Sequence, residues 1–140
     1  MSDRYRRNDR KRSACLPGGR VWLTTAIQTK AEASLRLLSY DVATGAALVD
    51  VEVFHVWRDE FSTNAKNSNA TPTPILDGNR IYVHFGASGT AALSTDGRVL
   101  WKTQLPHDTQ HGQGGSPALF GNLLIINCDG FEDPYVIALD

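Results

Sequence analysis

Two stretches of the 140-residue chain decide the fold: TPILDGNRIYV at Thr73–Val83 and SPALFGNLLII at Ser116–Ile126. They align without a gap, and a constant offset of 43 residues pairs the Pro, the turn Gly and the apolar positions of one with those of the other. Each stretch predicts a short strand, a Gly turn and a second, apolar strand. A unit that recurs at this period is typical of a repeat architecture.

Further segments extend the repeat in both directions. LSYDVATGAALV (Leu38–Val49), ALSTDGRVLW (Ala92–Trp101) and the final IALD (Ile137–Asp140) are three versions of one later segment. The first unit enters the pattern at GGRVWLT (Gly18–Thr24), which matches GNRIYVH of the second unit. Each full unit therefore holds four short strands, with a D-x-x-T-G or D-G turn before the last.

The hydrophobic pattern predicts strands and no helix. Apolar residues recur with a period near two, and Gly, Pro, Asn and Asp interrupt them every several residues. Ala31–Leu38 has a short helix-like pattern but runs into a turn signal, so we interpret it as loop then strand. The predicted strands are Arg20–Ala26, Leu35–Asp41, Ala47–Phe54, Pro74–Leu76, Arg80–Phe85, Thr90–Ser94, Arg98–Gln104, Pro117–Phe120, Leu123–Asn127 and Tyr135–Leu139.

Four antiparallel strands in about 43 residues make one blade of a β-propeller. The predicted fold is therefore all-β, a β-propeller fragment with about two and a half to three four-stranded antiparallel blades. Propellers close with about four to eight blades, and each blade has apolar faces that only a neighbour buries. We therefore expect the chain to pack against the remaining blades of a longer propeller or against other copies of itself.

The repeat resembles the pyrroloquinoline-quinone (PQQ) repeat, the quinoprotein-type propeller repeat with the pattern A-L-D-x-x-T-G-x-x-x-W. SYDVATG (39–45), ALSTDGRVLW and IALD carry the resemblance, which covers residues 18–140. It implies that a tryptophan of each blade docks onto the neighbouring blade. Trp101 holds that position, whereas the smaller Val49 holds it in the first copy, so we expect a looser contact there.

Residues 1–17 match no blade strand and are expected to form a disordered basic segment. Met1–Arg12 carries six basic and two acidic residues, which leaves eight basic and thirteen acidic residues for the mildly acidic remainder. This balance argues against nucleic acid as a partner. No apolar stretch is long enough to span a membrane, and no apolar segment follows Arg6-Arg7 as a secretion signal requires. The compartment stays open, since only the family resemblance implies the cell envelope or periplasm.

The residues that the resemblance implies for catalysis do not have their counterparts here. Quinoprotein dehydrogenases hold PQQ over a disulfide between adjacent cysteines, with calcium nearby and an aspartate as base, but Cys15 and Cys128 lie 113 positions apart. We predict no catalytic residue, no metal site and no cofactor, and PQQ stays open only through the resemblance. Cys128 ends an apolar run and is interpreted as a buried small side chain. Four histidines are interpreted as turn and surface residues: His55, His84, His107 and His111.

Two polar loops lead into first strands of the repeat, NAKNSNATPTP (Asn64–Pro74) and HDTQHGQGGSP (His107–Pro117). Such loops open toward the central funnel of a propeller, and loops on a rigid scaffold often carry function. We hypothesise a recognition surface at this mouth for a protein or a small polar ligand, formed in part by Asn64, Lys66, Asn67, His111 and Gln113. The alternative is ordinary turn chemistry, with Asn, Gly and Ser favoured for their backbone conformations.

The predicted function is therefore a non-catalytic β-propeller repeat module for binding or scaffolding. The alternative is a fragment of a PQQ-dependent oxidoreductase whose cofactor site lies on blades outside this chain. A truncated reading frame without a function of its own is a third interpretation.

Overall fold

A computed structural model describes residues 13–15, 19–57, 67–109 and 111–140 of the chain. These residues form three antiparallel sheets and one short 3₁₀ turn at Gly86–Ser88, so the all-β prediction is confirmed. None of the described residues forms a helix that is long and apolar enough to cross a membrane. The strands are β1 (Ser13–Cys15), β2 (Arg20–Gln28), β3 (Glu32–Asp41), β4 (Ala47–Trp57), β5 (Ile75–Asp77), β6 (Arg80–His84), β7 (Thr90–Ser94), β8 (Val99–Thr103), β9 (Ala118–Phe120), β10 (Leu123–Cys128) and β11 (Tyr135–Leu139).

The strand order within each sheet follows the chain, so neighbouring strands are joined by hairpins. The first sheet is ordered β1-β2-β3-β4, the second β5-β6-β7-β8 and the third β11-β10-β9. All ten predicted strands are present, and the third sheet has the three strands that were predicted for the incomplete third unit. β1 was not predicted. It lies within residues 1–17, for which the sequence predicted no strand, and its Cys15 pairs with Trp22 on β2.

The three sheets share one pairing register. Tyr82 lies between Ile75 on β5 and Ala92 on β7, and Ile125 lies between Ala118 on β9 and Ala138 on β11. In the first sheet, the corresponding neighbours of Trp22 are Cys15 and Ser39. The 43-residue repeat of the sequence is therefore also a repeat of strand pairing, and β1, β5 and β9 hold equivalent positions.

The first two sheets also share a β-bulge. The pairing of β3 with β4 shifts between Ser39 and Tyr40, which leaves Leu48 as the extra residue of β4. The pairing of β7 with β8 shifts between Ala92 and Leu93, which leaves Leu100 as the extra residue of β8. Because bulges are specific local features of a strand, the same bulge after the same turn supports the equivalence of the two units.

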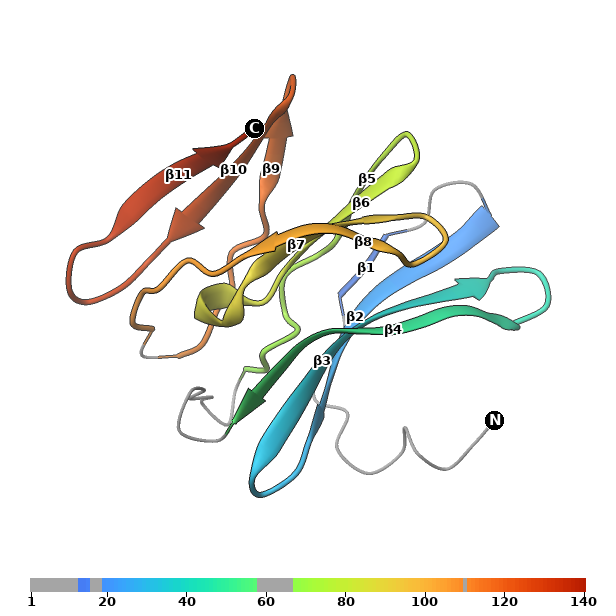
Figure 1. The fold of residues 1–140 in the computed structure, drawn as a ribbon, viewed down its shortest axis with the longest axis horizontal. Helices are drawn as coiled ribbons and strands as arrows, with labels where there is room; N and C mark the ends of the chain where they lie inside the picture. The colour runs from blue at the N-terminus through green and yellow to red at the C-terminus, as the bar shows by residue number, and fades with distance from the viewer. Residues whose placement is uncertain (1–12, 16–18, 58–66, 110) are drawn as a thin grey trace.

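Two hydrophobic clusters place the second sheet between the other two (Figure 1). The side chains of β6 alternate, so Ile81 and Val83 pack toward the first sheet while Tyr82 packs toward the third. The first cluster includes Trp22, Leu35, Leu37, Val53, Phe54, Ile81, Val83, Phe85 and Leu93. The second includes Tyr82, Ala92, Leu105, Leu124, Ile126 and Cys128, and the buried position predicted for Cys128 is confirmed.

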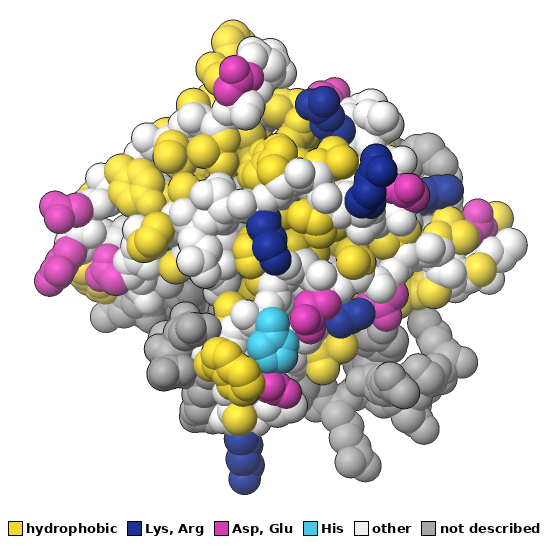
Figure 2. Space-filling model, in the orientation of Figure 1, with side chains coloured by type: hydrophobic (Ala, Val, Ile, Leu, Met, Phe, Trp, Pro, Cys, Tyr) yellow, Lys and Arg dark blue, Asp and Glu magenta, His cyan; other side chains and the backbone are white. Residues whose placement is uncertain are grey.

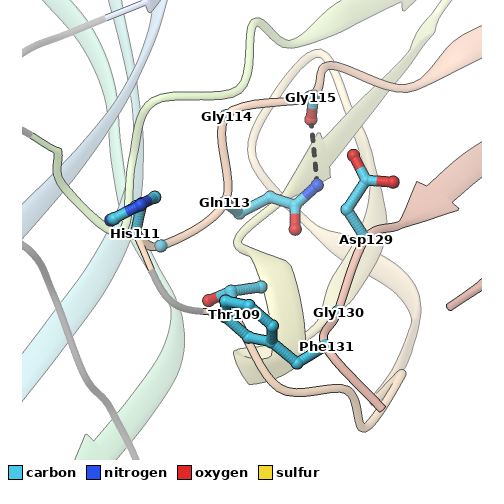
Figure 3. Close-up of a pocket in the computed structure, with 9 residues that line it drawn as sticks. Thr109, His111, Gln113, Gly114, Gly115, Asp129, Gly130 and Phe131 are labelled. Atoms are coloured by element: carbon cyan, nitrogen blue, oxygen red, sulfur yellow. Dashed lines mark hydrogen bonds between the residues drawn. The ribbon is translucent and has the colours of Figure 1, made fainter. Parts of the chain in front are cut away.

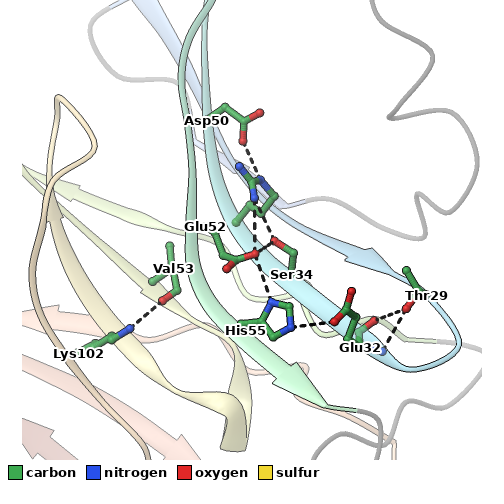
Figure 4. A network of polar contacts seen from close by, with 9 residues as sticks. Thr29, Glu32, Ser34, Asp50, Glu52, Val53, His55 and Lys102 are labelled. Atoms are coloured by element: carbon green, nitrogen blue, oxygen red, sulfur yellow. Dashed lines mark hydrogen bonds and ion pairs between the residues drawn. The ribbon is translucent and has the colours of Figure 1, made fainter.

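A polar network covers part of β3 and β4 on the face away from the second sheet (Figure 4). Arg36 Nε donates to Asp50 Oδ1 at 2.8 Å, and His55 Nε2 lies 3.1 Å from Glu32 Oε2. The Ser34 hydroxyl group donates to Glu52 and, with His55 and Arg36 nearby, lowers the pKa of that carboxyl group. This part of the first sheet presents charges to solvent.

The outward face of the third sheet is apolar instead. Phe120 on β9 is 76% exposed and Val136 on β11 is 67% exposed. Their neighbours on this face, Leu123 and Ile125 on β10, are half-buried. The two outer sheets therefore present surfaces of different chemistry.

Candidate functional site

The two polar loops predicted as a recognition surface lie side by side. The backbone N–H of Thr73 donates to Ser116 Oγ at 2.9 Å, which ties together positions one repeat apart. Asn67 and Gly112 are also in contact, since a Cβ added to Gly112 would lie 3.5 Å from Asn67 Nδ2. Loops that are 43 residues apart in sequence thus form one surface.

The five predicted site residues have different outcomes. Asn67, His111 and Gln113 are brought into this region, and His111 and Gln113 line the same pocket. Asn67 Oδ1 accepts from the backbone N–H of Ser68 at 2.9 Å and from the hydroxyl group of Thr71, so its carbonyl oxygen stabilises its own loop. Asn64 and Lys66 lie outside the described residues.

Gln113 holds the loop in place through its side-chain amide. It is 6% exposed, and its Nε2 donates to the carbonyl oxygens of Asn127 at 3.3 Å and Gly115 at 3.4 Å. Because both of these acceptors are carbonyl oxygens, the end of the amide that faces them is the NH₂ group. The amide oxygen, Oε1, therefore faces His107 Nε2 at 3.0 Å. The other His107 nitrogen lies 2.6 Å from the carbonyl oxygen of Leu105. Gln113 therefore connects the 107–115 loop to β10.

A pocket of about 310 Å³ lies between the 109–115 loop and the loop that follows β10 (Figure 3). Asp108 joins the two loops, because its carboxylate accepts from the backbone N–H groups of Phe131 at 3.3 Å and Glu132 at 3.4 Å. The described lining residues are Thr109, His111, Gly112, Gln113, Gly114, Gly115, Asp129, Gly130 and Phe131.

The pocket offers a carboxylate, an aromatic ring and several hydrogen-bonding groups. Asn127 Nδ2 donates to Asp129 Oδ1 at 2.8 Å, which orients that carboxylate at the rim. Phe131, which is 67% exposed, lines the same pocket. No group of three or more His, Cys, Asp or Glu side chains among the described residues is arranged to hold a metal ion.

Asp129 and Phe131 were not predicted from the sequence, although the spacing of the repeat carries a signal for their loop. His84 and Asn127 are equivalent at an offset of 43, whereas Thr90 and Val136 are equivalent at an offset of 46. The chain between these paired positions is therefore three residues longer in the third unit than in the second. Length changes between repeats fall in loops, often on the binding face.

His84 corrects the prediction that the histidines are turn and surface residues. It is fully buried at the end of β6, with Nδ1 2.8 Å from Thr90 Oγ1 and with no hydrogen-bond partner for Nε2 among the described residues. Burial, and to a lesser extent the nearby His107, lowers the pKa of His84 to about 4. His84 is therefore a neutral residue of the interior at neutral pH.

Trp101 lies on β8 where the second sheet meets the third. It is half-buried against the cluster that includes Tyr82 and Leu124, and its ring centroid lies 6.3 Å from that of Tyr82. Val49, its counterpart in the first unit, is 9% exposed and lies against Gly97 of the second sheet. Both positions thus face the sheet that follows along the chain.

No model of a protein family matches the chain, and no curated protein matches it.

Proposed function

We propose that this chain is a PQQ-like β-propeller repeat segment that acts as a non-catalytic binding module. The pocket between the 109–115 loop and the 129–131 loop is its binding site. The observation that carries the proposal is the meeting of two loops from consecutive repeats, tied by the Thr73–Ser116 hydrogen bond, beside a pocket that Asp129 lines. The shared register and the shared bulge support the propeller part of the proposal.

The chemistry of the pocket favours a cationic group as the ligand. Asp129 supplies negative charge, and the Phe131 ring supplies a surface that attracts cations. A volume of about 310 Å³ is at the small end of ligand sites, which suits one side chain or a small molecule. The ligand is therefore an ammonium or guanidinium group, either free or on a protein partner.

A pair of matched probes tests this proposal. Nα-acetylarginine amide should shift the NMR amide signals of Gly112 and Gly130, whereas Nα-acetylcitrulline amide, which replaces the guanidinium group with a neutral ureido group and carries no other charge, should not. Asp129→Asn should weaken Nα-acetylarginine amide binding roughly fivefold, because the charge is removed and the shape is kept.

Asp133→Asn is the control, since Asp133 lies in the same loop but does not line the pocket. Equal shifts from both probes, or equal losses in the two variants, would contradict a cation site.

A further inference from the structure

One wall of the pocket between the 109–115 and 129–131 loops consists of the backbone of Gly114 and Gly115 (Figure 3). Among the described residues, the N–H and C=O groups of Gly114 and the N–H group of Gly115 have no hydrogen-bond partner. Only the carbonyl oxygen of Gly115 is engaged, by Gln113 Nε2 at 3.4 Å. Both glycines are exposed, and nothing lies within 4 Å of a Cβ added to Gly114. A ligand can therefore approach these backbone groups closely.

The equivalent residues of the second unit, Thr71 and Pro72, close this stretch of backbone. They lie 43 positions before Gly114 and Gly115 and are half-buried and buried, respectively. Pro72 has no N–H group, and its carbonyl oxygen accepts from the Thr24 hydroxyl group at 3.1 Å. The Thr71 hydroxyl group bonds within its own loop. The third unit therefore replaces a closed stretch of loop with an open one through a change of residue type in the loop itself.

The loop that follows β10 carries negative charge beyond the pocket. Asp129 lines the pocket, whereas Glu132 and Asp133 are exposed and do not line it. No basic residue occurs between Asp129 and Asp140. Figure 2 shows acidic side chains at the edge of the molecule where the β10–β11 loop lies. A ligand that fills only the pocket leaves the charges of Glu132 and Asp133 without an opposite charge.

We propose that the ligand of this site is a basic segment of a protein partner, an inference that rests on the cation site proposed above. One Arg or Lys side chain enters the pocket beside Asp129, because a volume of about 310 Å³ holds one such side chain. The peptide backbone of that residue exchanges hydrogen bonds with Gly114 and Gly115, as extended peptides do with open backbone elsewhere. A neighbouring basic residue lies over Glu132 and Asp133.

Two probes with the same single positive charge test the backbone part of this proposal. Nα-acetylarginine amide has a peptide group on each side of its Cα, whereas n-butylguanidine has only the guanidinium group and the alkyl chain. In NMR titrations of the 140-residue chain, we expect Nα-acetylarginine amide to bind about tenfold more tightly, because it gains hydrogen bonds. It should also shift the amide signals of Gly114 and Gly115, which n-butylguanidine should leave unchanged.

Gly114→Val should remove this tenfold difference. The fold has space for the added side chain, because nothing lies within 4 Å of a Cβ at Gly114, but the side chain covers the backbone groups. Ala118→Val is the matched control, since it adds a valine at an exposed position of β9 that does not line the pocket. The control should keep the difference between the two probes.

Two peptides of equal length test the flanking charges. Nα-acetyl-Arg-Arg-Arg-amide should bind about fivefold more tightly than Nα-acetyl-Gly-Arg-Gly-amide. Asp133→Asn should reduce that gain, although the same variant should leave the binding of Nα-acetylarginine amide unchanged. Asp77→Asn, which removes an exposed carboxylate on β5 outside this pocket, should leave the gain as it is.

The outcomes separate this inference from the cation site on which it rests. Equal binding of n-butylguanidine and Nα-acetylarginine amide, with both weakened by Asp129→Asn, overturns the protein segment and leaves the cation site in place. Equal binding of Nα-acetylarginine amide and Nα-acetylcitrulline amide removes the cation site, and this inference with it. The inference is also overturned if Gly114→Val keeps the tenfold difference, or if Asp133→Asn does not change the gain from the flanking arginines.

Discussion

The imidazole of His84 occupies a site that holds a different side chain in each repeat. Thr24 is its counterpart in the first unit and Asn127 in the third. Thr24 donates to the carbonyl oxygens of Ala70 and Pro72, both at 3.1 Å. His84 contacts Thr90 through one nitrogen and leaves the other buried without a partner among the described residues. Only the second unit therefore places an ionisable group at this position.

His84 should make the protein less stable in mild acid. Its pKa is about 4 in the folded chain and about 6.5 when unfolded, so the unfolded state binds the extra proton between these values. The stability is fully present above about pH 6.5 and is lost as the pH falls toward 4, by about 3 kcal/mol in total. Urea unfolding at a series of pH values between 7.5 and 4 measures this loss.

His84→Asn, which installs the residue found at this position in the third unit, separates His84 from the other titrating groups. The variant should lose most of the pH dependence between 6.5 and 4 even if its stability at pH 7 is lower. An unchanged slope in that interval would assign the acid sensitivity to other residues.

Among the elements, the β6–β7 connection depends on a glycine. Gly89 has a φ of +142°, and a Cβ there would lie 2.4 Å from Phe54 Cζ and 3.0 Å from the carbonyl oxygen of Thr103. Phe54 is 7% exposed and meets Phe85 edge to face with ring centroids 6.0 Å apart. The backbone of this turn therefore packs directly against the Phe54 ring of the first sheet, with no room for a side chain at Gly89.

Gly89→Ala should destabilise the chain by about 3 kcal/mol, because it combines an unfavourable φ with a collision against an ordered ring. Gly78→Ala is the control, since it adds the same Cβ at a glycine that also has a positive φ, of +57°, but nothing lies within 4 Å of that atom. Chemical denaturation should show a cost of only about 1 kcal/mol for the control. Similar losses in the two variants would mean that φ alone, and not the contact, decides the cost.

The strands were predictable because their side chains alternate between two packed faces. The ends of the strands were harder to predict than the strands themselves. β3 begins at Glu32 because the Thr29 hydroxyl group accepts from the N–H groups of Ala31 and Glu32 and closes a tight turn. β1 has no alternation to reveal it, since its residues follow a run of basic side chains and its place comes from pairing with β2. Pairing that depends on a neighbour leaves no periodicity in the sequence.

The candidate site was only half predictable for a related reason. The polar loop that holds His111 and Gln113 is conspicuous in sequence, but Asp129 and Phe131 join it only because β10 returns beside that loop. The exposure of His84 was wrongly predicted because burial at a strand end depends on the next sheet, and a local pattern carries no information about that sheet.

At the scale of the whole molecule, the contact between the second and third sheets depends on Trp101. The cluster around it joins Tyr82 and Ala92 of one sheet to Leu124 and Ile126 of the other. Trp101 is half-buried, so removing its ring loses part of the stabilisation that a fully buried tryptophan gives.

Trp101→Ala should therefore lower the free energy of unfolding by about 2 kcal/mol. Hydrogen exchange should accelerate in β10 more than in β3, since β3 packs in the other cluster. Phe120→Ala is the control, because that ring is 76% exposed and its loss should cost less than about 0.5 kcal/mol. Uniform acceleration in both strands would show that the sheets unfold as one unit.

The repeated register creates a hazard of mispairing during folding, and two residue pairs oppose it. Asp77 lies opposite Arg80 in the second sheet, whereas Phe120 lies opposite Leu123 at the same place in the third. If β5 and β9 changed places, Asp77 would face Leu123 and Phe120 would face Arg80, which matches neither charge nor hydrophobicity. These pairs therefore favour the pairing of β5 with β6 and of β9 with β10 over the exchanged pairing.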